Sequence, residues 1–556
     1  MSRAALLLAA GLLVSSAAAD AQAPAEHPTS PARSRGDLPV PAAQSPRDSL
    51  RRAEEYLRMG RMPDAVEILE AVHGAHAQDE IAARALVRAY LLAGRADEAV
   101  ELCRARAQER GGEDPDLWIE LSRCSLQAGR GEEAADALLT CLRLRPSWVM
   151  RLTDPFELAV SDSAAGPAAL ARLESAARAA ETNPGVKEIL AQVYATAGRS
   201  AEAIALLVEA DRAQERKGEL LFPLAHTLSR RGTPAAALAA YDSVLALGPS
   251  DGTAENVWFE KGELLASLGR APEAVAAYEE AVRRFPGGPL FLRATIARAD
   301  LLMTEVRDLD GARQAYEEVL AQADRARRKE RQQPLVDRAR LALAECALRQ
   351  GDLETATERF GDLEKEAGQS ALREAAAFQL AEIHFFQGRF VEAEEAYYQL
   401  TDRFPQGDWV NDAFRRVLLL GETRGGPEVE QYAQVEYLRR LDRGDEALAA
   451  CRQILAAAPG HPLEAELRFT EMRLLGDAGQ WAAADSALTR ILADHPRSRA
   501  APAALLWLGE QSSSEEERIE RGTECLERVL LDYPGSFEAR RARGLLRGLR
   551  EAKANS

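Results

Sequence analysis

The chain has 556 residues, of which 46% are hydrophobic and 28% charged, so it is long enough for several domains and most of it is expected to fold. The formal net charge is -18, and this acidic balance argues against nucleic acid as a general partner because phosphate backbones repel it. Six cysteines without a C-x-x-C pair are too few for a disulfide framework in a chain of this length.

The N-terminus predicts export. Arg3 precedes an apolar run over residues 4–19, which is short for a membrane span and is followed by small residues. Cleavage after Ala19 or Ala21 fits a secretory signal, so residues 1–21 are expected to be removed; a short membrane anchor is the alternative. No cysteine stands at the cleavage region, which argues against a lipid anchor. We therefore expect a periplasmic or secreted protein with no integral span after cleavage.

Residues 22–47 predict a disordered linker, because six prolines lie there among small and polar residues. Two helical arrays are expected after it, over residues 48–325 and 335–535. The charged stretch "ADRARRKERQQP" between them predicts a soft boundary near residues 325–335. Residues 536–556 read as a capping helix and a tail that hide the last apolar face.

A short turn phrase recurs along both arrays, as in "AGRADEA", "AGRSAEA" and "QGRFVEA". The first spacings are 34 residues, from Gly60 to Gly94, and 35, from Gly94 to Gly129. A period near 34 is typical of a helical array. Each glycine is expected to end a first helix in the left-handed conformation before a second helix begins. The later turn glycines are Gly198, Gly232, Gly269, Gly351, Gly388, Gly444 and Gly479.

This pattern resembles the tetratricopeptide repeat, in which small residues let two helices approach and large ones fill the space between neighbours. The unit that begins at Glu374 places Ala381 and Ala393 at the small positions, Tyr397 at a large one and Pro405 at the stop. The resemblance covers nearly all of the mature chain. It implies an all-α fold: an α-solenoid, a right-handed superhelix of about 12 such helical hairpins.

The C-terminal half carries a second resemblance. The phrases "AYYQLTDRFPQGDW" and "CLERVLLDYPGSFEARRA", with "WLGE" at residues 507–510, are similar to repeats of Gram-negative outer-membrane-assembly and Tol–Pal-associated periplasmic proteins. This resemblance agrees with the expected signal peptide.

No catalytic motif stands out. The sequence has no P-loop, no G-x-S-x-G and no H-E-x-x-H, and the helical repeats leave no room for a separate α/β domain. His73 and His76 are three residues apart but lack a third ligand nearby, so they are expected to be surface histidines rather than a metal site. We expect no enzyme activity and no cofactor.

Surface recognition remains, and the repeat family implies a concave groove lined by the first helices. Arg84, Arg88 and Arg123 fall at groove positions and predict a basic patch for protein segments. A solvated face with packed arginine stems is the alternative. Further along, Glu263, Glu345 and Glu382 turn the groove acidic.

The stretch "HFFQGRFVEAEEAYYQLTDRFP" concentrates aromatic residues in one repeat. Most of them match scaffold positions, and His384 is expected in the core. Phe378, Phe385 and Phe386 fall at groove positions and predict an apolar docking patch. Contact with a neighbouring helix is the alternative for these three rings.

The cysteines match packing positions and are expected to be buried thiols. One disulfide is conceivable, between Cys103 and Cys124, because a second helix packs on the next first helix. The sequence thus predicts a non-catalytic periplasmic scaffold that binds protein segments in its groove, plausibly in cell-envelope assembly. A peptidoglycan- or carbohydrate-associated envelope factor is the alternative, and the oligomeric state is left open.

Overall fold

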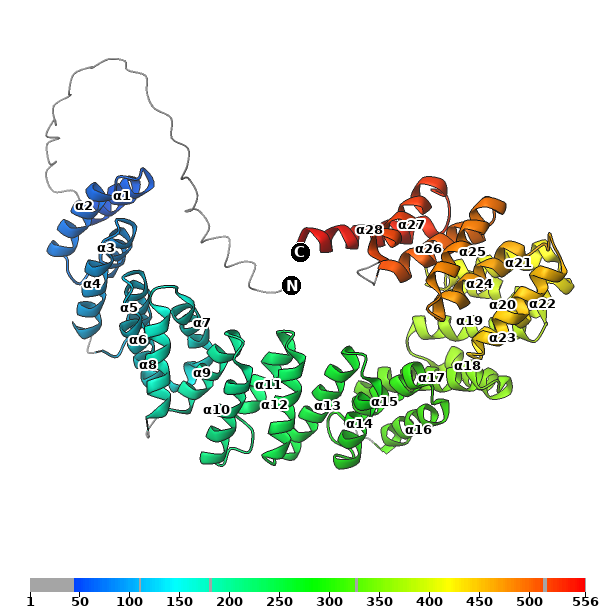
Figure 1. Ribbon diagram of the computed structural model, residues 1–556, viewed down its shortest axis with the longest axis horizontal. Coiled ribbons are helices and arrows are strands. Elements are labelled where there is room, and N and C mark those ends of the chain that lie inside the picture. The colour runs from blue at the N-terminus through cyan, green and yellow to red at the C-terminus, as the bar shows by residue number, and fades with distance from the viewer. Residues whose placement is uncertain (1–44, 110–111, 180–182, 326–328, 514–517, 556) are drawn as a thin grey trace, which may run out of the picture. The chain divides into compact units, whose positions relative to one another are not determined.

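The computed structural model describes residues 45–109, 112–179, 183–325, 329–513 and 518–555 (Figure 1). They form 28 α-helices, a short 3-10 helix (η3) and a short π-helix (η4), and no residue in these ranges belongs to a strand. The predicted all-α solenoid is confirmed. The predicted signal peptide and nearly all of the predicted linker lie outside these ranges. The linker ends slightly earlier than predicted, because α1 begins at Pro46 with the Ser45 hydroxyl accepting from the Asp48 N–H.

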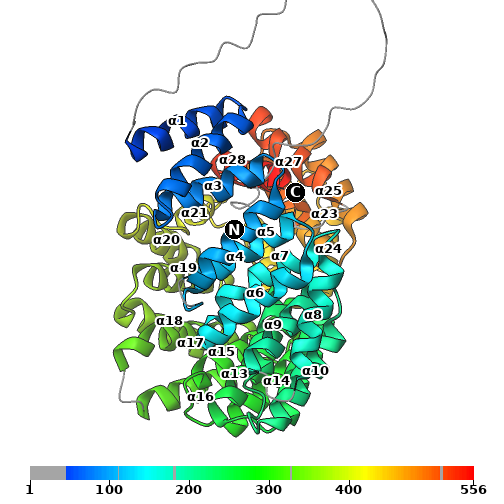
Figure 2. The ribbon, with the colours of Figure 1, turned by 90° about the vertical axis from the view of Figure 1, so that its left-hand side faces the viewer.

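The chain divides into two compact units, and the first contains residues up to Leu144 together with Asp162–Ala169. Its helices follow one another as hairpins, each in contact with the next (Figure 2). They are α1 (Pro46–Arg58), α2 (Met62–Ala75), α3 (Glu80–Leu92), α4 (Ala96–Glu109), α5 (Pro115–Gln127) and α6 (Gly131–Leu144).

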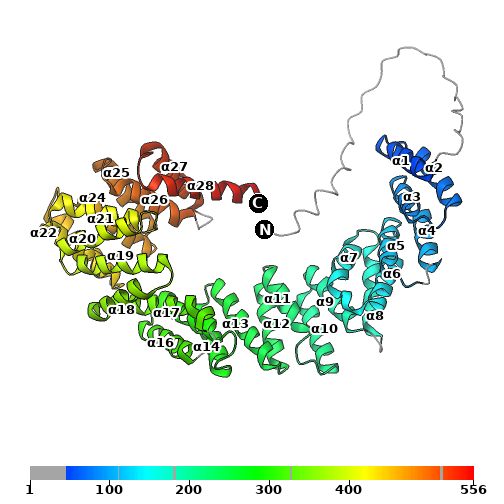
Figure 3. The ribbon, with the colours of Figure 1, turned by 180° about the vertical axis from the view of Figure 1, so that it is seen from behind.

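The second unit contains residues 145–161 and 170–556, of which the described part continues the series of hairpins (Figure 3). The helix α8 (Gly166–Arg178) begins in the first unit and ends in the second. The other helices of the first half are η3 (Pro146–Trp148), α7 (Val149–Ser161), α9 (Pro184–Thr196), α10 (Ser200–Ala213), α11 (Leu221–Arg230), α12 (Pro234–Ala246), α13 (Asp251–Ser267), α14 (Ala271–Arg284), α15 (Phe291–Leu301), η4 (Leu302–Val306), α16 (Leu309–Arg325), α17 (Lys329–Arg349) and α18 (Leu353–Glu366).

The C-terminal helices carry the candidate site described below. They are α19 (Ser370–Phe386), α20 (Phe390–Arg403), α21 (Val410–Thr423), α22 (Pro427–Arg440), α23 (Gly444–Ala457), α24 (Glu464–Asp477), α25 (Trp481–Asp494), α26 (Ala500–Ser513), α27 (Ile519–Asp532) and α28 (Glu538–Asn555). The last of these corresponds to the predicted capping helix: it packs on α26 and α27, and its Leu546 is buried against them.

The hairpin of α19 and α20 shows how the repeat folds. Gly388 takes a left-handed conformation, with φ of 71°, which a side chain would strain. Ala381 and Ala393 are fully buried, and their small side chains let the two helices approach. Tyr397 is also fully buried and fills the space beside them. The packing positions read from the sequence are therefore confirmed in this hairpin.

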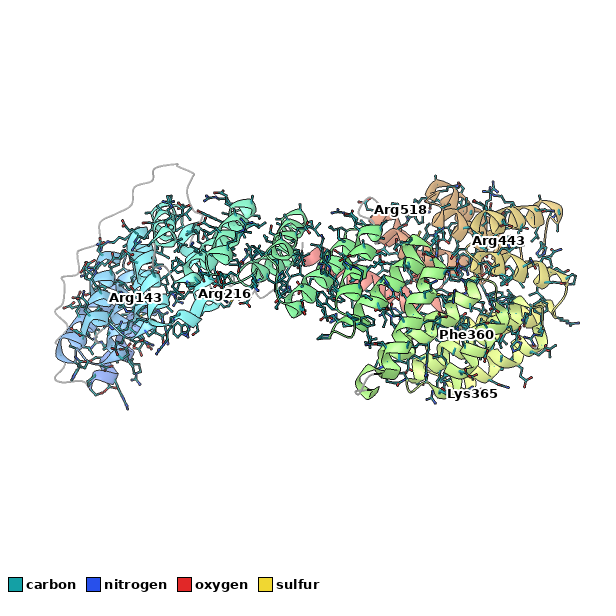
Figure 4. All side chains as sticks on the ribbon, turned by 90° about the horizontal axis from the view of Figure 1, so that it is seen from below. Arg143, Arg216, Phe360, Lys365, Arg443 and Arg518 are labelled. Atoms are coloured by element: carbon teal, nitrogen blue, oxygen red, sulfur yellow. The ribbon has the colours of Figure 1, made fainter. Side chains whose placement is uncertain are left out.

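One predicted turn glycine is wrong. The residue in the left-handed conformation between α22 and α23 is Asp442, with φ of 56°, and Gly444 is the first residue of α23. Arg443, labelled in Figure 4, lies between them as the N-cap residue. Asp tolerates this conformation better than most side chains because its short carboxylate can bond locally. The turn has the ordinary length, with an aspartate where most of the repeats have glycine; Arg307 takes the same conformation before α16.

The repeat order changes at α21. Between Gly388 and Asp442 the chain is 54 residues long, about one helix more than a period. The extra helix is α21, which packs mainly on α20, while α22 packs on α19 and pairs with α23 as a hairpin. The sequence marked this region as irregular but did not show that a whole helix is inserted.

The predicted soft boundary at residues 325–335 stays a prediction. The apolar core continues across it, because Tyr316 and Val319 of α16 share a cluster with Ala339 and Leu343 of α17.

Buried carboxylates connect consecutive repeats in a way that the sequence did not reveal. Glu374, which is 4% exposed, accepts from the backbone N–H groups of Asp408 (3.2 Å) and Trp409 (2.7 Å), just before α21 begins. Glu255 does the same for Leu290 N–H at 2.8 Å. Each acid satisfies donors at the start of the next repeat that have no helical partner.

Replacing Glu374 with alanine leaves those two N–H groups without their acceptor. We expect the free energy of opening of α19–α21 to fall by about 1–3 kcal/mol, the cost of unsatisfied buried donors. Hydrogen exchange of these amides measures it. Glu395→Ala, at an exposed position of α20, is the matched control and should change little. Equal exchange in the two variants would contradict the linking role.

Among the residues that the structure describes, no helix combines the length and the apolar character needed to cross a bilayer.

Candidate functional site

The predicted phenylalanine patch is covered by the chain's own helix α22. Phe385 is fully buried, in edge contact with Tyr432 of α22 at 6.4 Å between ring centroids. Phe386 is half-buried and lies 5.4 Å from the ring of Tyr437. In this structure α22 occupies the face of Phe385 that would receive a partner, which is the contact with a neighbouring helix given above as the alternative. The docking role of Phe385 stays a prediction.

Arg440 completes this cover. Its guanidinium donates to Glu345 on α17 (2.6 Å) and to Gln379 on α19 (3.1 Å). The helix α22 thus packs on α19, and Arg440 at its last position reaches Glu345 of α17, one of the acids predicted along the groove.

Phe378 has a different environment. It is 7% exposed, and its ring stacks on Trp409 at 4.6 Å and an angle of 24°. Both rings line a pocket of about 270 Å³ formed by residues of α19, α21, α22 and α24 and by the start of α26. Of the three predicted rings, Phe378 is the one placed at a concave surface of this kind.

A second pocket of about 290 Å³ continues this surface over α21, α24, α26 and α28. The two pockets share lining residues of α21, α24 and α26, including Asp412, Phe469 and Arg473. We call them together the inner groove. Concave pockets with a few convergent polar groups are the usual form of a binding site.

A network of buried charges forms the floor of the inner groove. Arg416 binds Glu382 through two parallel bonds, Nε to Oε1 at 2.8 Å and Nη2 to Oε2 at 2.9 Å. Glu436, 2% exposed, accepts from Arg439 at 3.1 Å and from the Thr470 hydroxyl at 2.7 Å. Burial alone would raise the pKa of Glu436, but the nearby arginines hold it well below its usual range.

Two further arginines at the groove are also paired. Arg415 binds Asp412 at 2.9 Å and Glu538 of α28 at 2.6 Å. Arg499 binds Glu422 at 2.7 Å. These pairs fix α21 against α26 and α28.

Arg473 is the exception. It lines both pockets, yet within the described ranges its guanidinium has no carboxylate within ion-pair distance and no hydrogen-bond acceptor. Burial lowers its pKa, and the neighbouring Arg439 lowers it further. The negative charges of Glu436 and Asp477 oppose this shift without pairing with Arg473. A half-buried guanidinium that lacks a direct partner favours the arrival of an anionic group.

Aromatic side chains form the walls around Arg473. The ring of Phe469 lies 5.6 Å from its guanidinium carbon, and Tyr432 lines the same pocket. Glu466 lies two helical turns earlier on α24, and burial raises the pKa of its carboxyl. The groove therefore offers one positive group without a direct partner between aromatic faces.

The predicted basic patch lies in the first unit. Arg84 and Arg88 are exposed on α3, and Arg123 is exposed on α5. Arg84 donates to Glu80 at 2.8 Å, and Glu80 also pairs with the buried Arg106. The positive charge of Arg84 is thus partly compensated. The binding role of these three arginines stays a prediction.

The acids predicted along the groove carry arginine partners from later helices. Glu382 binds Arg416 and Glu345 binds Arg440, as described above, and Glu263 lies 3.8 Å from Arg293. The predicted acidic groove is therefore largely neutralised within the chain.

The role of Arg473 was missed at the sequence level. It lies on the first helix of a repeat, "ELRFTEMRLLGDAG", as groove residues do, but so do many other arginines of this chain. Only the three-dimensional arrangement shows which arginines have partners.

Comparison with known proteins agrees with the fold. Family models described as tetratricopeptide repeat match residues 50–111, 222–289 and 296–371, and a second such model matches residues 375–407. The chain belongs to the tetratricopeptide-repeat proteins. Such repeats generally act as scaffolds that bind other proteins.

Solved structures of repeat proteins are similar to parts of the chain. The C-terminal part of a repeat protein from Cytophaga hutchinsonii is 11% identical and has a TM-score of 0.31. The match covers 51% of this chain and 96% of the Cytophaga chain. A tetratricopeptide repeat protein from Parabacteroides merdae is 13% identical and has a TM-score of 0.31. The match covers 52% of this chain and 97% of the Parabacteroides chain. No curated protein matches the sequence.

Proposed function

We propose that this protein is an exported, non-catalytic scaffold that binds acidic segments of other proteins in the inner groove, in the assembly of a Gram-negative cell envelope. The observation that carries the proposal is Arg473, a half-buried guanidinium without an ion-pair or hydrogen-bond partner among the described residues, in a concave surface. An aspartate or glutamate side chain of a bound segment supplies the missing charge, and the aromatic walls accept its apolar neighbours.

The compartment rests on the N-terminal sequence. Arg3, the apolar run over residues 4–19 and the small residues after it have the order of a cleaved signal. The C-terminal phrases that are similar to envelope repeats support the same compartment. Fractionation of a Gram-negative host, with N-terminal sequencing of the mature chain, tests this part; a chain retaining its first 21 residues in the cytoplasm would refute it.

Binding is tested by photo-cross-linking from the groove. A photo-reactive residue at Asn411, which is exposed at the second pocket, should capture a protein partner in the envelope fraction. The same residue at Asp402, exposed on α20, is the matched control and should capture little.

Arg473→Gln in the Asn411 background is expected to reduce capture by about tenfold or more, since one charge-assisted hydrogen bond contributes about 1.5–3 kcal/mol. Arg473→Lys keeps the charge but loses the bidentate geometry. Its capture of the partner should lie between that of the wild type and that of Arg473→Gln. Undiminished capture in Arg473→Gln would show that the groove binds without this group.

A second candidate is a peptidoglycan-associated factor. The stacked rings of Phe378 and Trp409 at the pocket favour it, because flat aromatic faces can receive sugar rings. Sedimentation with purified sacculi separates the two proposals: co-sedimentation that Trp409→Ala abolishes, without any captured protein, would favour this candidate.

A further inference from the structure

Two buried thiols touch at the junction between the second and third hairpins. Cys103 Sγ on α4 and Cys124 Sγ on α5 are 3.5 Å apart, and each side chain is 1% exposed. All six cysteines are free thiols in this structure. Both residues belong to the first unit, so their contact lies within one compact body.

The other buried thiols have different neighbours. Cys141 donates to the Pro115 carbonyl at 3.0 Å, and Cys451 donates to the Leu467 carbonyl at 3.0 Å. Cys346 contacts the thioether sulfur of Met303 at 3.8 Å. Cys103 and Cys124 are thus set apart by a direct contact between two thiols, the groups that can be oxidised to a disulfide.

The surroundings of the pair make the two thiols unequal. The hydrogen bond from Cys103 lowers the pKa of Cys124. Burial and the negative charge of Glu120 oppose this shift, and the positive charges of Arg106 and Arg123 support it. The same contact, together with burial, raises the pKa of Cys103. Since the thiolate is the reactive form, Cys124 is the first nucleophile of the pair.

We propose that Cys103 and Cys124 are a disulfide-forming site that joins α4 covalently to α5 when the chain meets a small-molecule disulfide. Formation needs the sulfurs to close from contact distance to bond length, about 2.0 Å. The helices already hold the two residues on facing sides of one junction, so a small shift of side chains is sufficient.

The reaction is two thiol–disulfide exchanges. When the α4–α5 junction opens transiently and exposes Cys124, which is 1% exposed in the closed junction, its thiolate attacks one sulfur of the oxidant. This attack breaks the oxidant's S–S bond and releases one thiolate. The Cys103 thiolate then attacks Cys124 Sγ of the mixed disulfide and releases the second. The two thiols lose two protons and two electrons, and the oxidant becomes two thiols.

The bond would constrain the junction between two hairpins. It closes a loop between positions 21 residues apart and links the last helix of one repeat to the first helix of the next. In a repeat array each hairpin contacts only its neighbours, so a covalent link at one junction stabilises the two hairpins that it joins. Arg123, on the same helix as Cys124, would be held more rigidly.

The test uses the purified full chain, treated with oxidised glutathione or with a reductant. Free thiols are alkylated under denaturing conditions, and the digest is analysed by mass spectrometry. We expect a Cys103–Cys124 linked peptide and four alkylated cysteines after oxidation. Hydrogen exchange of α4 and α5 should slow by about 100-fold, as a loop of this length implies.

Cys124→Ser should lose both the linked peptide and the slowing, while Cys141→Ser, a buried cysteine on α6, is the matched control and should keep both. Six alkylated cysteines after oxidation, or a linked peptide with another pairing, would overturn the proposal. The wild-type mass spectrum decides the pairing even where a variant fails to fold.

Discussion

Replacing Arg416 with leucine is expected to lower the free energy of opening of helices α19–α24 by about 3–5 kcal/mol, which is the cost of breaking a buried ion pair from one side. Arg416 binds Glu382 in a bidentate pair and lies 3.8 Å from Glu436. Its guanidinium also lies over the Phe385 ring, at 4.4 Å. Without it, Glu382, 7% exposed, loses its counter-ion.

Hydrogen exchange of the α19–α24 amides measures the change locally, which suits a long repeat array that does not unfold in one step. Arg443→Leu is the matched control. Arg443 pairs with Glu446 at 2.6 Å, but both side chains are half exposed, so the loss should stay below about 1 kcal/mol.

The pH dependence separates the electrostatic cause from lost packing. In Arg416→Leu the Glu382 carboxylate is buried without its counter-ion, so its charged form is disfavoured relative to the protonated form. Protonation removes that cost, so the stability of the variant is recovered as pH falls and lost as pH rises. The variant should therefore regain part of its loss at acidic pH.

The stability of the wild type should change with pH in the opposite direction: it should fall as the pH becomes acidic. The folded state lowers the pKa of Glu436, so its contribution is present above the unfolded value and is lost as pH falls below it. A loss in Arg416→Leu that does not change with pH would assign the effect to packing alone.

The sequence predicts the regular part of the fold because glycine and alanine have few alternatives at their positions. Gly388 must take the left-handed conformation, and Ala381 and Ala393 must be small where helices approach. These local requirements repeat with the hairpin. Their spacing indicates a helical array, and the resemblance to the tetratricopeptide repeat implies the solenoid.

The irregular features escape the sequence because their causes are not local. Asp442 replaces a glycine in the left-handed turn, and no neighbouring residue announces it. In the sequence Glu374 cannot be told from a surface glutamate; in the structure it accepts a hydrogen bond from Trp409 N–H at the start of α21. Arg473 is recognisable as a candidate site only after the partners of the surrounding arginines are known. Each depends on a residue about one repeat or more away.

Phe385→Ala is expected to lower the free energy of opening of α19–α22 by about 3–5 kcal/mol, the usual cost of deleting a buried phenylalanine ring. Phe385 is fully buried and makes edge contacts with Phe386 at 6.1 Å and Phe390 at 5.7 Å. Removing the ring leaves a cavity between α19 and α22, and tight packing prevents the surrounding helices from filling it completely.

The same variant tests whether α22 is the permanent occupant of this face. If it is, the loss appears as faster exchange in α19 and α22, while Tyr398→Ala, 49% exposed on α20, changes exchange little. If α22 leaves the face to admit a partner, Phe385→Ala would leave exchange nearly unchanged and would instead reduce cross-linking from Asn411. The contacts of Tyr432, Tyr437 and Arg440 with this face favour the first outcome.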